Sequence, residues 1–364
     1  MLFDTFFIRD LKLKNRLVRS ATYEKRADER GFVTDALIEF YETLAWGGVG
    51  LIITGNAIVH PSGFSVERAV CIYDDAYVPG LRRLAHAIHR FDGKVVMQIT
   101  HGGRQCYPDM LGGNPPIAPS AVYEPILNVT PHAMTEDEIW EVIGAFGSAA
   151  KRVQASGFDG VQIHAAHGYL ISEFLSSHTN RREDDWGGDE ERRFSFLQEV
   201  IKAIRANVDA DYPVMIKMNS SDFLKDGGLT PQESLSIARK LQGLGIDAIE
   251  VSGGMFESDV RLRAARGDIL KPEDEAYFKE TAAMFKKELD IPVILVGGIR
   301  SRAVCEELLV SGCAHLISLS RPLIREPDLP EKLRDGKEKA DCISCNGCMR
   351  FKKLDMVRCI QIED

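Results

Sequence analysis

Two histidines and a tyrosine, His164, His167 and Tyr169, lie within six residues of one another. Imidazoles can donate hydrogen bonds to an oxygen that gains negative charge, and a phenol can supply a proton. Together the three side chains suit the polarisation and reduction of a double bond conjugated to a carbonyl. Any one of them alone would fit a structural role, but three in one place favour a catalytic site.

The residues before this group predict a β-strand that ends at the histidines. Val161 and Ile163 alternate with Gln162 and His164, a period of two that sends successive side chains to opposite faces. In α/β proteins, ligands bind at the carboxyl ends of parallel strands. We therefore expect the histidines and the tyrosine to face a ligand.

Strand-like and helix-like segments alternate along the whole chain. Besides the strand that ends at His164, strands are expected at 17–21, 49–55, 94–100, 213–219, 246–253, 291–298 and 314–320. Helices are expected at 35–46, 77–91, 135–156, 189–208, 230–244, 273–289 and 302–310. The β-branched strand centres suit strands buried on both faces, and eight such units predict an α/β fold, the (β/α)8 TIM barrel. A doubly wound sheet is the alternative, but the glycine-rich turn expected after its first strand is absent.

Three additions to the barrel are expected. Residues 6–16 predict an N-terminal hairpin, and the proline-rich stretch 102–131 predicts an active-site insertion after the third strand, adjoining His101. The last part of the chain is rich in cysteine. We expect two domains, a barrel over residues 1–335 and a Cys-rich C-terminal extension over residues 336–364.

Composition restricts the class of protein. The chain of 364 residues is 45% hydrophobic and carries a net charge of −9, which argues against nucleic acid or an anionic membrane as the main partner. No apolar run approaches the roughly 20 residues that span a bilayer, and the N-terminus lacks a signal-peptide pattern. We expect a cytoplasmic protein whose eight cysteines are reduced or bind metal.

Two segments predict a phosphate site at the same end of the barrel. The sequence VGGIR (296–300) follows the seventh strand, and SLSRP (318–322) ends the eighth. Loops after these strands often bind phosphate, because glycine lets backbone N–H groups approach and a helix N-terminus favours an anion. Arg321 adds a planar, permanently charged group. A glycine pair alone can simply permit a turn, but the two features together favour a phosphate ligand.

The stretch HAAHGYLISEFLSSHTNRREDDWGG (164–188) resembles the signature of the old yellow enzyme family, the FMN-dependent ene-reductases and NADH:flavin oxidoreductases. More narrowly, it resembles the branch that includes 2,4-dienoyl-CoA reductase. The resemblance extends from about Phe7 to Pro330. It implies that NAD(P)H reduces a bound FMN, which then reduces an α,β-unsaturated carbonyl compound. His164 and His167 would bind the carbonyl oxygen, and Tyr169 would donate a proton to the α-carbon.

The resemblance also implies a set of FMN contacts. Lys217 matches the position of a cation near flavin N1, where a fixed positive charge should raise the reduction potential; a solvated lysine is the alternative. Gly298 and Arg321 would hold the phosphate. The other implied contacts are Ser20, Ala21 and Thr22 beside the ring, Ala57 through its backbone, Gln98 at the pyrimidine edge, His164, and Gly253 with Gly254 near the phosphate.

Four cysteines lie in the last 23 residues, with the spacing C-x2-C-x2-C-x10-C: Cys342, Cys345, Cys348 and Cys359. Such spacing can enclose a [4Fe–4S] cluster or a zinc ion. The dienoyl-CoA reductase branch carries a four-cysteine [4Fe–4S] site here, with its second and third intervals one residue longer. There the cluster relays electrons from a further flavin domain, so in this chain we expect an external electron donor, such as a separate subunit or a ferredoxin. A cluster, reduced thiols without a cluster, and zinc stay open.

Two other functions are compatible with these features. One is a barrel that binds flavin or another phosphate ligand as a carrier or sensor without turnover. The other is an aldolase or isomerase acting on a sugar phosphate, although it lacks an evident Schiff-base lysine other than Lys217. The sequence specifies neither the natural substrate, nor NADH against NADPH, nor the oligomeric state, although barrels of this kind often form homo-oligomers.

Overall fold

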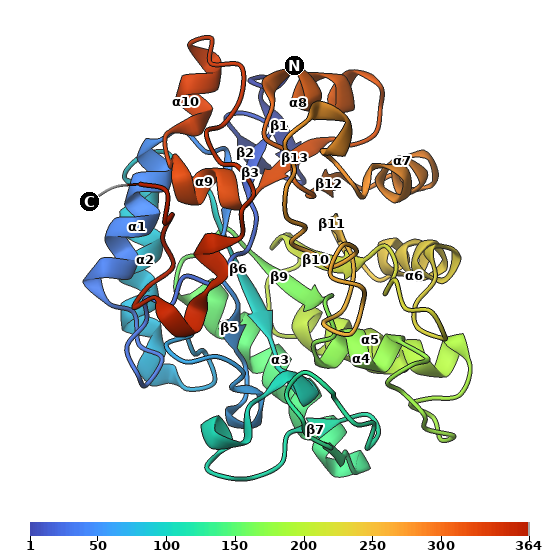
Figure 1. Ribbon diagram of the computed structural model, residues 1–364. Helices are drawn as coiled ribbons and strands as arrows, with labels where there is room; N and C mark the ends of the chain where they lie inside the picture. Colours follow the sequence, from blue (N-terminus) through green and yellow to red (C-terminus); the bar gives the residue numbers. More distant parts are fainter. Residues whose placement is uncertain (363–364) are drawn as a thin grey trace.

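The computed structural model describes residues 1–362, and its centre is a closed barrel of eight parallel strands (Figure 1). Each strand pairs with its neighbour along the chain, and β13 pairs with β3, which closes the ring. The TIM-barrel prediction is confirmed. The strands are β3 (Leu17–Arg19), β4 (Leu51–Ile53), β6 (Val95–Thr100), β9 (Gly160–Ala165), β10 (Val214–Asn219), β11 (Ala248–Ser252), β12 (Val293–Leu295) and β13 (Leu316–Leu319).

Helices surround the barrel (Figure 1). Each longer helix is amphipathic: in α5, for example, Leu197, Val200, Ile201 and Ile204 share one buried face. The helices are α1 (Asp35–Trp46), α2 (Val78–His89), α3 (Glu136–Ala155), α4 (Leu170–Leu175), α5 (Glu190–Arg205), α6 (Pro231–Gly243), α7 (Lys279–Glu288), α8 (Arg302–Val310), α9 (Arg321–Arg325) and α10 (Leu329–Arg334).

The helix expected at 273–289 begins later than predicted, at Lys279. The residues before it form the short 3₁₀ helix η5 (Pro272–Asp274) and then an irregular stretch. The Glu275 carboxylate is buried there and accepts the backbone N–H groups of Arg300 and Ser301. These two hydrogen bonds satisfy two N–H groups of the loop after β12, and they keep Glu275 outside the helix.

The predicted N-terminal hairpin consists of the antiparallel strands β1 (Phe6–Ile8) and β2 (Leu11–Leu13). Its residues Ile8, Leu11 and Leu13 are buried against inward-facing residues of the barrel such as Leu51 and Met215. The hairpin therefore fills the amino-terminal end of the barrel with apolar side chains. Ligands must enter from the carboxyl end.

The insertion after β6 contains two 3₁₀ helices, η3 (Gly103–Gln105) and η4 (Pro108–Leu111), and the two-residue strand β7 (Ile117–Ala118). β7 pairs with β8 (His132–Ala133). A further two-residue strand, β5 (Ala57–Ile58), pairs with β6.

The C-terminal tail forms η6 (Gly347–Met349) and η7 (Phe351–Lys353) on the side of the barrel where α1, α2 and α9 lie (Figure 1). Within residues 1–362, no helix combines the length and the apolar content needed to cross a bilayer.

The start of α3 yields a stability prediction. The Thr135 side chain accepts the backbone N–H of Glu138, and the Glu138 carboxylate accepts the backbone N–H of Thr135 in return. Thr135→Ala should lower the free energy of unfolding in urea by about 1 kcal/mol, because the Glu138 N–H loses its side-chain acceptor. The exposed substitution Ser195→Ala on α5 serves as control and should change it by less than about 0.5 kcal/mol. Equal effects of the two substitutions would contradict the assigned cap.

Candidate active site

The catalytic candidates meet at the carboxyl end of β9. His164 lies in β9, and His167 and Tyr169 follow before α4. The ring centroid of His164 is 5.2 Å from that of His167 and 4.8 Å from that of Tyr169. Among the described residues, the buried Nδ1 of His164 has no hydrogen-bond partner. A nitrogen in this state is suited to a ligand.

His167 is anchored from two neighbouring strands. Its backbone, at the positive φ of 63°, donates its N–H to Asn219 Oδ1 at the end of β10. Its Nε2 lies 2.7 Å from the Ser252 hydroxyl at the end of β11. These contacts fix the ring in one orientation and leave its other nitrogen for a ligand.

Burial sets the protonation of the three side chains. It lowers the pKa of His164 to about 3 and, with His164 and Lys217 as further causes, the pKa of His167 well below its usual value. Burial likewise raises the pKa of Tyr169 to about 12. At neutral pH the site thus holds two neutral imidazoles and a protonated phenol, the forms that donate hydrogen bonds and a proton.

A buried carboxylate, Glu250 on β11, organises the interior of the barrel and was not predicted from the sequence. Its oxygens accept hydrogen bonds from Ser20, Ser318 and Gln162. Lys217 Nζ lies 3.4 Å away. Burial raises the pKa of Glu250, but Lys217 and the three hydrogen bonds outweigh it, so the net pKa is lowered and the group is ionised.

Lys217 is therefore half of an ion pair. It is 4% exposed, and its Nζ donates to Ser20 Oγ at 2.8 Å. The solvated-lysine alternative is excluded by this burial. The sequence did not reveal that the Glu250 carboxylate lies 3.4 Å from this positive charge.

The other residues expected around the flavin ring lie at the ends of the first three strands. Gln98 on β6 donates to Gln162, which joins it to the Glu250 network. Ser20 points inward to Glu250, whereas Thr22 bonds to the Ser20 carbonyl and lies 2.8 Å from the Ser320 hydroxyl. Ala21 stands between them, and Ala57 is buried in β5.

The residues expected around the phosphate also gather at one edge. Gly253 and Gly254 follow β11, Gly298 follows β12, and Arg321 is the first residue of α9 after β13. Gly298 has a φ of +71°, and a Cβ there would come within 2.7 Å of the Tyr277 ring. The position therefore requires glycine. Arg321 Nη1 donates to the carbonyl of Arg266.

Unpartnered polar atoms at the barrel mouth fit a flavin. Among residues 1–362, buried side-chain atoms without a hydrogen bond occur at the ends of four strands: Thr54 after β4, Thr100 in β6, His164 in β9 and Ser220 after β10. Buried polar groups are normally paired, so these four atoms at one end of the barrel could each bond to a ligand with several hydrogen-bonding atoms. A flavin ring, with its carbonyls and ring nitrogens, is such a ligand.

The insertion after β6 is tied to the loop after β11 through a buried ion pair. Arg104 is fully buried, and its Nη2 lies 2.6 Å from the Glu257 carboxylate. Glu257 also contacts His178, 3.0 Å away. The first residues of the insertion are thus part of the site wall and not a surface loop. Glu257 was not foreseen, because only the fold brings it to Arg104.

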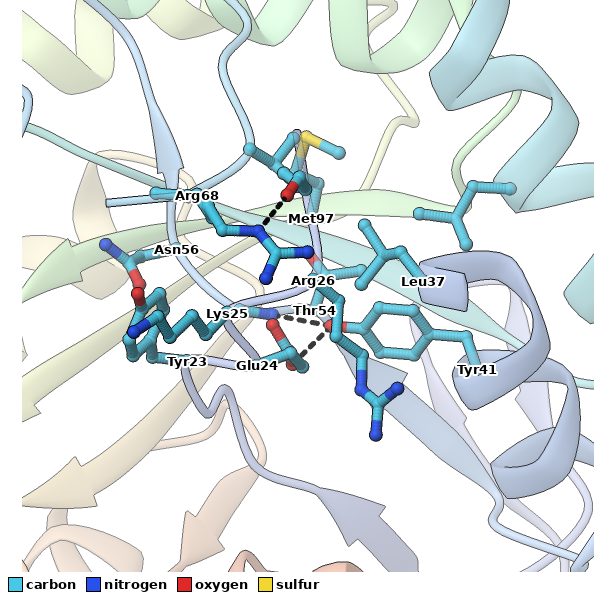
Figure 2. Close-up of a pocket in the computed structure, with 15 residues that line it drawn as sticks. Tyr23, Glu24, Lys25, Arg26, Leu37, Tyr41, Thr54, Asn56, Arg68 and Met97 are labelled. Atoms are coloured by element: carbon cyan, nitrogen blue, oxygen red, sulfur yellow. Dashed lines mark hydrogen bonds between the residues drawn. The ribbon is translucent and has the colours of Figure 1, made fainter. Parts of the chain in front are cut away.

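A cavity of about 340 Å³, part of it open to solvent, lies beside this mouth between α1 and the segment after β3 (Figure 2). It does not include the histidines. Figure 2 shows the Tyr41 hydroxyl facing Glu24, to which it donates at 2.5 Å. Burial raises the pKa of Glu24 to about 7, despite the opposing effect of Arg19.

The four tail cysteines line a second cavity of about 350 Å³, together with Arg321. None of the cysteines forms a disulfide, and burial raises the pKa of Cys348 to about 11. Within the described part of the chain, no three His, Cys, Asp or Glu side chains converge as they would around a single bound ion.

This arrangement, on a barrel closed at its other end, fits the class of TIM barrels that hold a phosphorylated flavin at the mouth. Residues 1–340 match the model of the NADH:flavin oxidoreductase / NADH oxidase family. The chain belongs to that family, which confirms the resemblance of residues 164–188. Membership of this family brings the barrel of the old yellow enzyme type and an FMN cofactor.

Individual relatives agree with this assignment. An NADH oxidase from Thermoanaerobacter brockii is 38% identical over 98% of this chain and 54% of its own length. The structure of a 2-naphthoyl-CoA reductase complex superposes with a TM-score of 0.90 at 30% identity, over 98% of this chain and 56% of that one. The structure of an old yellow enzyme homologue from Zymomonas mobilis superposes with a TM-score of 0.80 at 26% identity, over 94% of this chain and 95% of that one. The chain thus spans about half the length of the first curated relatives it matches.

The cavity in Figure 2 yields a prediction for the pH dependence of stability. Because the pKa of Glu24 is about 7 in the folded protein and near 4.5 in the unfolded chain, the folded state holds the extra proton between these values. The stability of the wild type should therefore fall as pH rises from 4.5 to 7. Glu24→Gln removes this loss.

In urea titrations, we subtract the free energy of unfolding of the wild type from that of Glu24→Gln. This difference should increase by up to a few kcal/mol as the pH rises from 5 to 8. Glu29→Gln, an exposed change nearby, should show no such trend. A difference that does not vary with pH would show that Glu24 ionises normally.

Proposed function

We propose that this protein takes hydride from NADH or NADPH and reduces the C=C bond of an α,β-unsaturated carbonyl compound. The observation that carries the proposal is the pair of neutral histidines, His164 and His167, whose rings lie 5.2 Å apart, beside the protonated Tyr169. A carbonyl oxygen that gains negative charge needs hydrogen-bond donors, and the α-carbon needs a proton. The three side chains supply both at one strand end.

The two alternatives have less support. A flavin carrier without turnover has no use for a phenol kept protonated next to two hydrogen-bond donors. A Schiff-base enzyme needs a lysine that can become neutral and nucleophilic. Lys217 Nζ is instead engaged by the ionised Glu250, 3.4 Å away, and by the Ser20 hydroxyl at 2.8 Å, so it is not free to attack a carbonyl.

FMN, when bound, supplies the hydride chemistry. Arg321 and the backbone around Gly298 would hold its phosphate, and Gln98 and Lys217 would face its ring. In the Lys217–Glu250 pair, the positive charge of Lys217 would lie near the flavin ring, and the nearby Glu250 carboxylate would weaken the electric field of that charge at the ring. His164 and His167 would bind the substrate oxygen at the carboxyl end of the barrel, opposite the end that the hairpin fills. Tyr169 would hold the proton.

We further propose that Cys342, Cys345, Cys348 and Cys359 bind a [4Fe–4S] cluster. All four line one cavity, and their C-x2-C-x2-C-x10-C spacing can enclose such a cluster. An electron donor outside residues 1–364 would then exchange electrons with the cluster. The free cysteines are compatible with the cytoplasm, where we place the protein as a homo-oligomer.

The proton donor can be tested by stopped-flow spectroscopy of the FMN-loaded protein. Tyr169→Phe should slow flavin reoxidation by an enone such as 2-cyclohexenone by about 10²-fold or more, since general acid catalysis contributes on this scale. Flavin reduction by NADH or NADPH should keep its rate. Tyr73→Phe, a tyrosine remote from the histidines, is the matched control.

Two wild-type results would contradict the function itself. A flavin that NAD(P)H reduces but no enone reoxidises would favour a carrier. A protein that cannot be loaded with FMN would favour a sugar-phosphate enzyme.

The cluster can be tested by iron analysis of anaerobically purified protein. Cys348→Ser should lose most of the iron and any broad absorption near ~400 nm, because it removes one thiolate ligand. Cys313→Ser, a cysteine outside the tail, should keep both. Zinc in place of iron, or no metal in the wild type, would sink the cluster assignment.

A further inference from the structure

Three cations of the C-terminal tail, Arg350, Lys352 and Lys353, are exposed to solvent. We call them the basic rim. They occur within four residues in a chain whose net charge is −9. None of the three forms an ion pair with a carboxylate among residues 1–362. Their charge is therefore available to an anion.

The backbone that carries the basic rim is held against the barrel at three points. Lys25 Nζ donates to the carbonyl of Phe351 at 2.9 Å, and Arg68 donates to the carbonyl of Asp355 at 2.7 Å. The N–H of Val357 donates to the carbonyl of Glu24 at 3.0 Å. The rim is thus fixed beside the segment that follows β3.

The same stretch of tail covers two aromatic residues at the catalytic mouth. The Phe351 ring packs edge-on against Tyr23 with centroids 5.1 Å apart, and Lys352 Nζ lies 5.6 Å from the centroid of Tyr107. The segment that leads to Tyr107 packs against the start of α4, directly after Tyr169: the N–H of Leu170 donates to the carbonyl of His101, and the N–H of Arg104 donates to the Glu173 carboxylate. The basic rim therefore stands at the entrance to the site that contains Tyr169.

If the reactive end of a ligand reaches Tyr169 from this side, the rest of the ligand must lie over the basic rim. Unpaired lysines and an arginine recognise phosphate, whose doubly charged form gains most from several cations at once. We propose that the basic rim binds a terminal phosphate of a nucleotide-bearing ligand while its reactive end occupies the site. This inference rests on the proposed function.

Two ligands would present this phosphate. One is NADPH, which differs from NADH by its 2′-phosphate. The other is a conjugated thioester of coenzyme A, whose nucleotide carries a 3′-phosphate. Both use the same recognition chemistry, and binding measurements can separate them.

Isothermal titration calorimetry of the oxidised, FMN-loaded protein tests the rim without turnover. One arm compares NADP⁺ with NAD⁺, and the other compares coenzyme A with pantetheine, which lacks the nucleotide. In at least one arm, the phosphate-bearing member should bind ten-fold or more tightly than its counterpart. Lys352→Gln/Lys353→Gln should reduce that preference at least five-fold, and 0.5 M salt should reduce it in the wild type.

The matched control is Lys279→Gln/Lys287→Gln, which removes two exposed lysines from α7. It should keep the wild-type preference. The inference is overturned if neither arm shows a preference in the wild type, or if the Lys352/Lys353 variant keeps it.

The enone assay with NADH separates this inference from the proposed function. A rim variant should reoxidise with 2-cyclohexenone at the wild-type rate, because that substrate carries no phosphate. A wild-type protein that is inactive with every enone would refute the proposed function. The calorimetric result would still decide whether the basic rim binds phosphate.

Discussion

The structure depends on one buried carboxylate. Glu250 has no exposed surface, and leaving an ionised group in that position without partners would cost several kcal/mol. Its four partners come from different places around the ring: Ser20 after β3, Gln162 on β9, Lys217 on β10 and Ser318 on β13. The strands must keep their register for all four to reach it. The chemistry at the mouth is built on this arrangement.

The barrel interior therefore has two layers with different roles. The lower layer is apolar, sealed by Ile8 and Leu13 of the hairpin, and it contributes the stability of a close-packed core. The upper layer is polar and almost dry. In such surroundings a charge is stabilised only by a specific partner, which explains why Glu250, with Lys217 and three hydrogen-bond donors beside it, is ionised whereas His164 is neutral.

Local patterns were sufficient to predict the barrel and the strand end at which His164, His167 and Tyr169 lie together. Alternation around Val161 places the strand, and the capping pair Thr135 and Glu138 places the helix start at the predicted residue. What failed depends on contacts between distant segments. The start of α7 is displaced because Glu275 accepts a hydrogen bond from a loop 25 residues away in the sequence. Glu250 was missed because, in its local sequence, it looks like any other residue of a strand.

The tail was predicted as a separate extension, yet it shares a residue with the phosphate site. Asn346 lies between two of the cysteines in a left-handed conformation, with φ at 55°. Its side-chain oxygen accepts from Arg321 Nη1, and its Nδ2 donates to the carbonyl of Ala265. One asparagine thus joins the cysteine segment, the loop after β11 and the arginine that faces the phosphate position.

This connection has a physical consequence for both sites. A guanidinium held at Nη1 keeps its direction, so less side-chain entropy is lost when Arg321 binds an anion. Any ligand that orders the segment from Cys345 to Cys348 also orders Asn346 and, through it, Arg321. The spacing of the cysteines therefore constrains the barrel as well as the tail, because a different interval would move Asn346 away from Arg321.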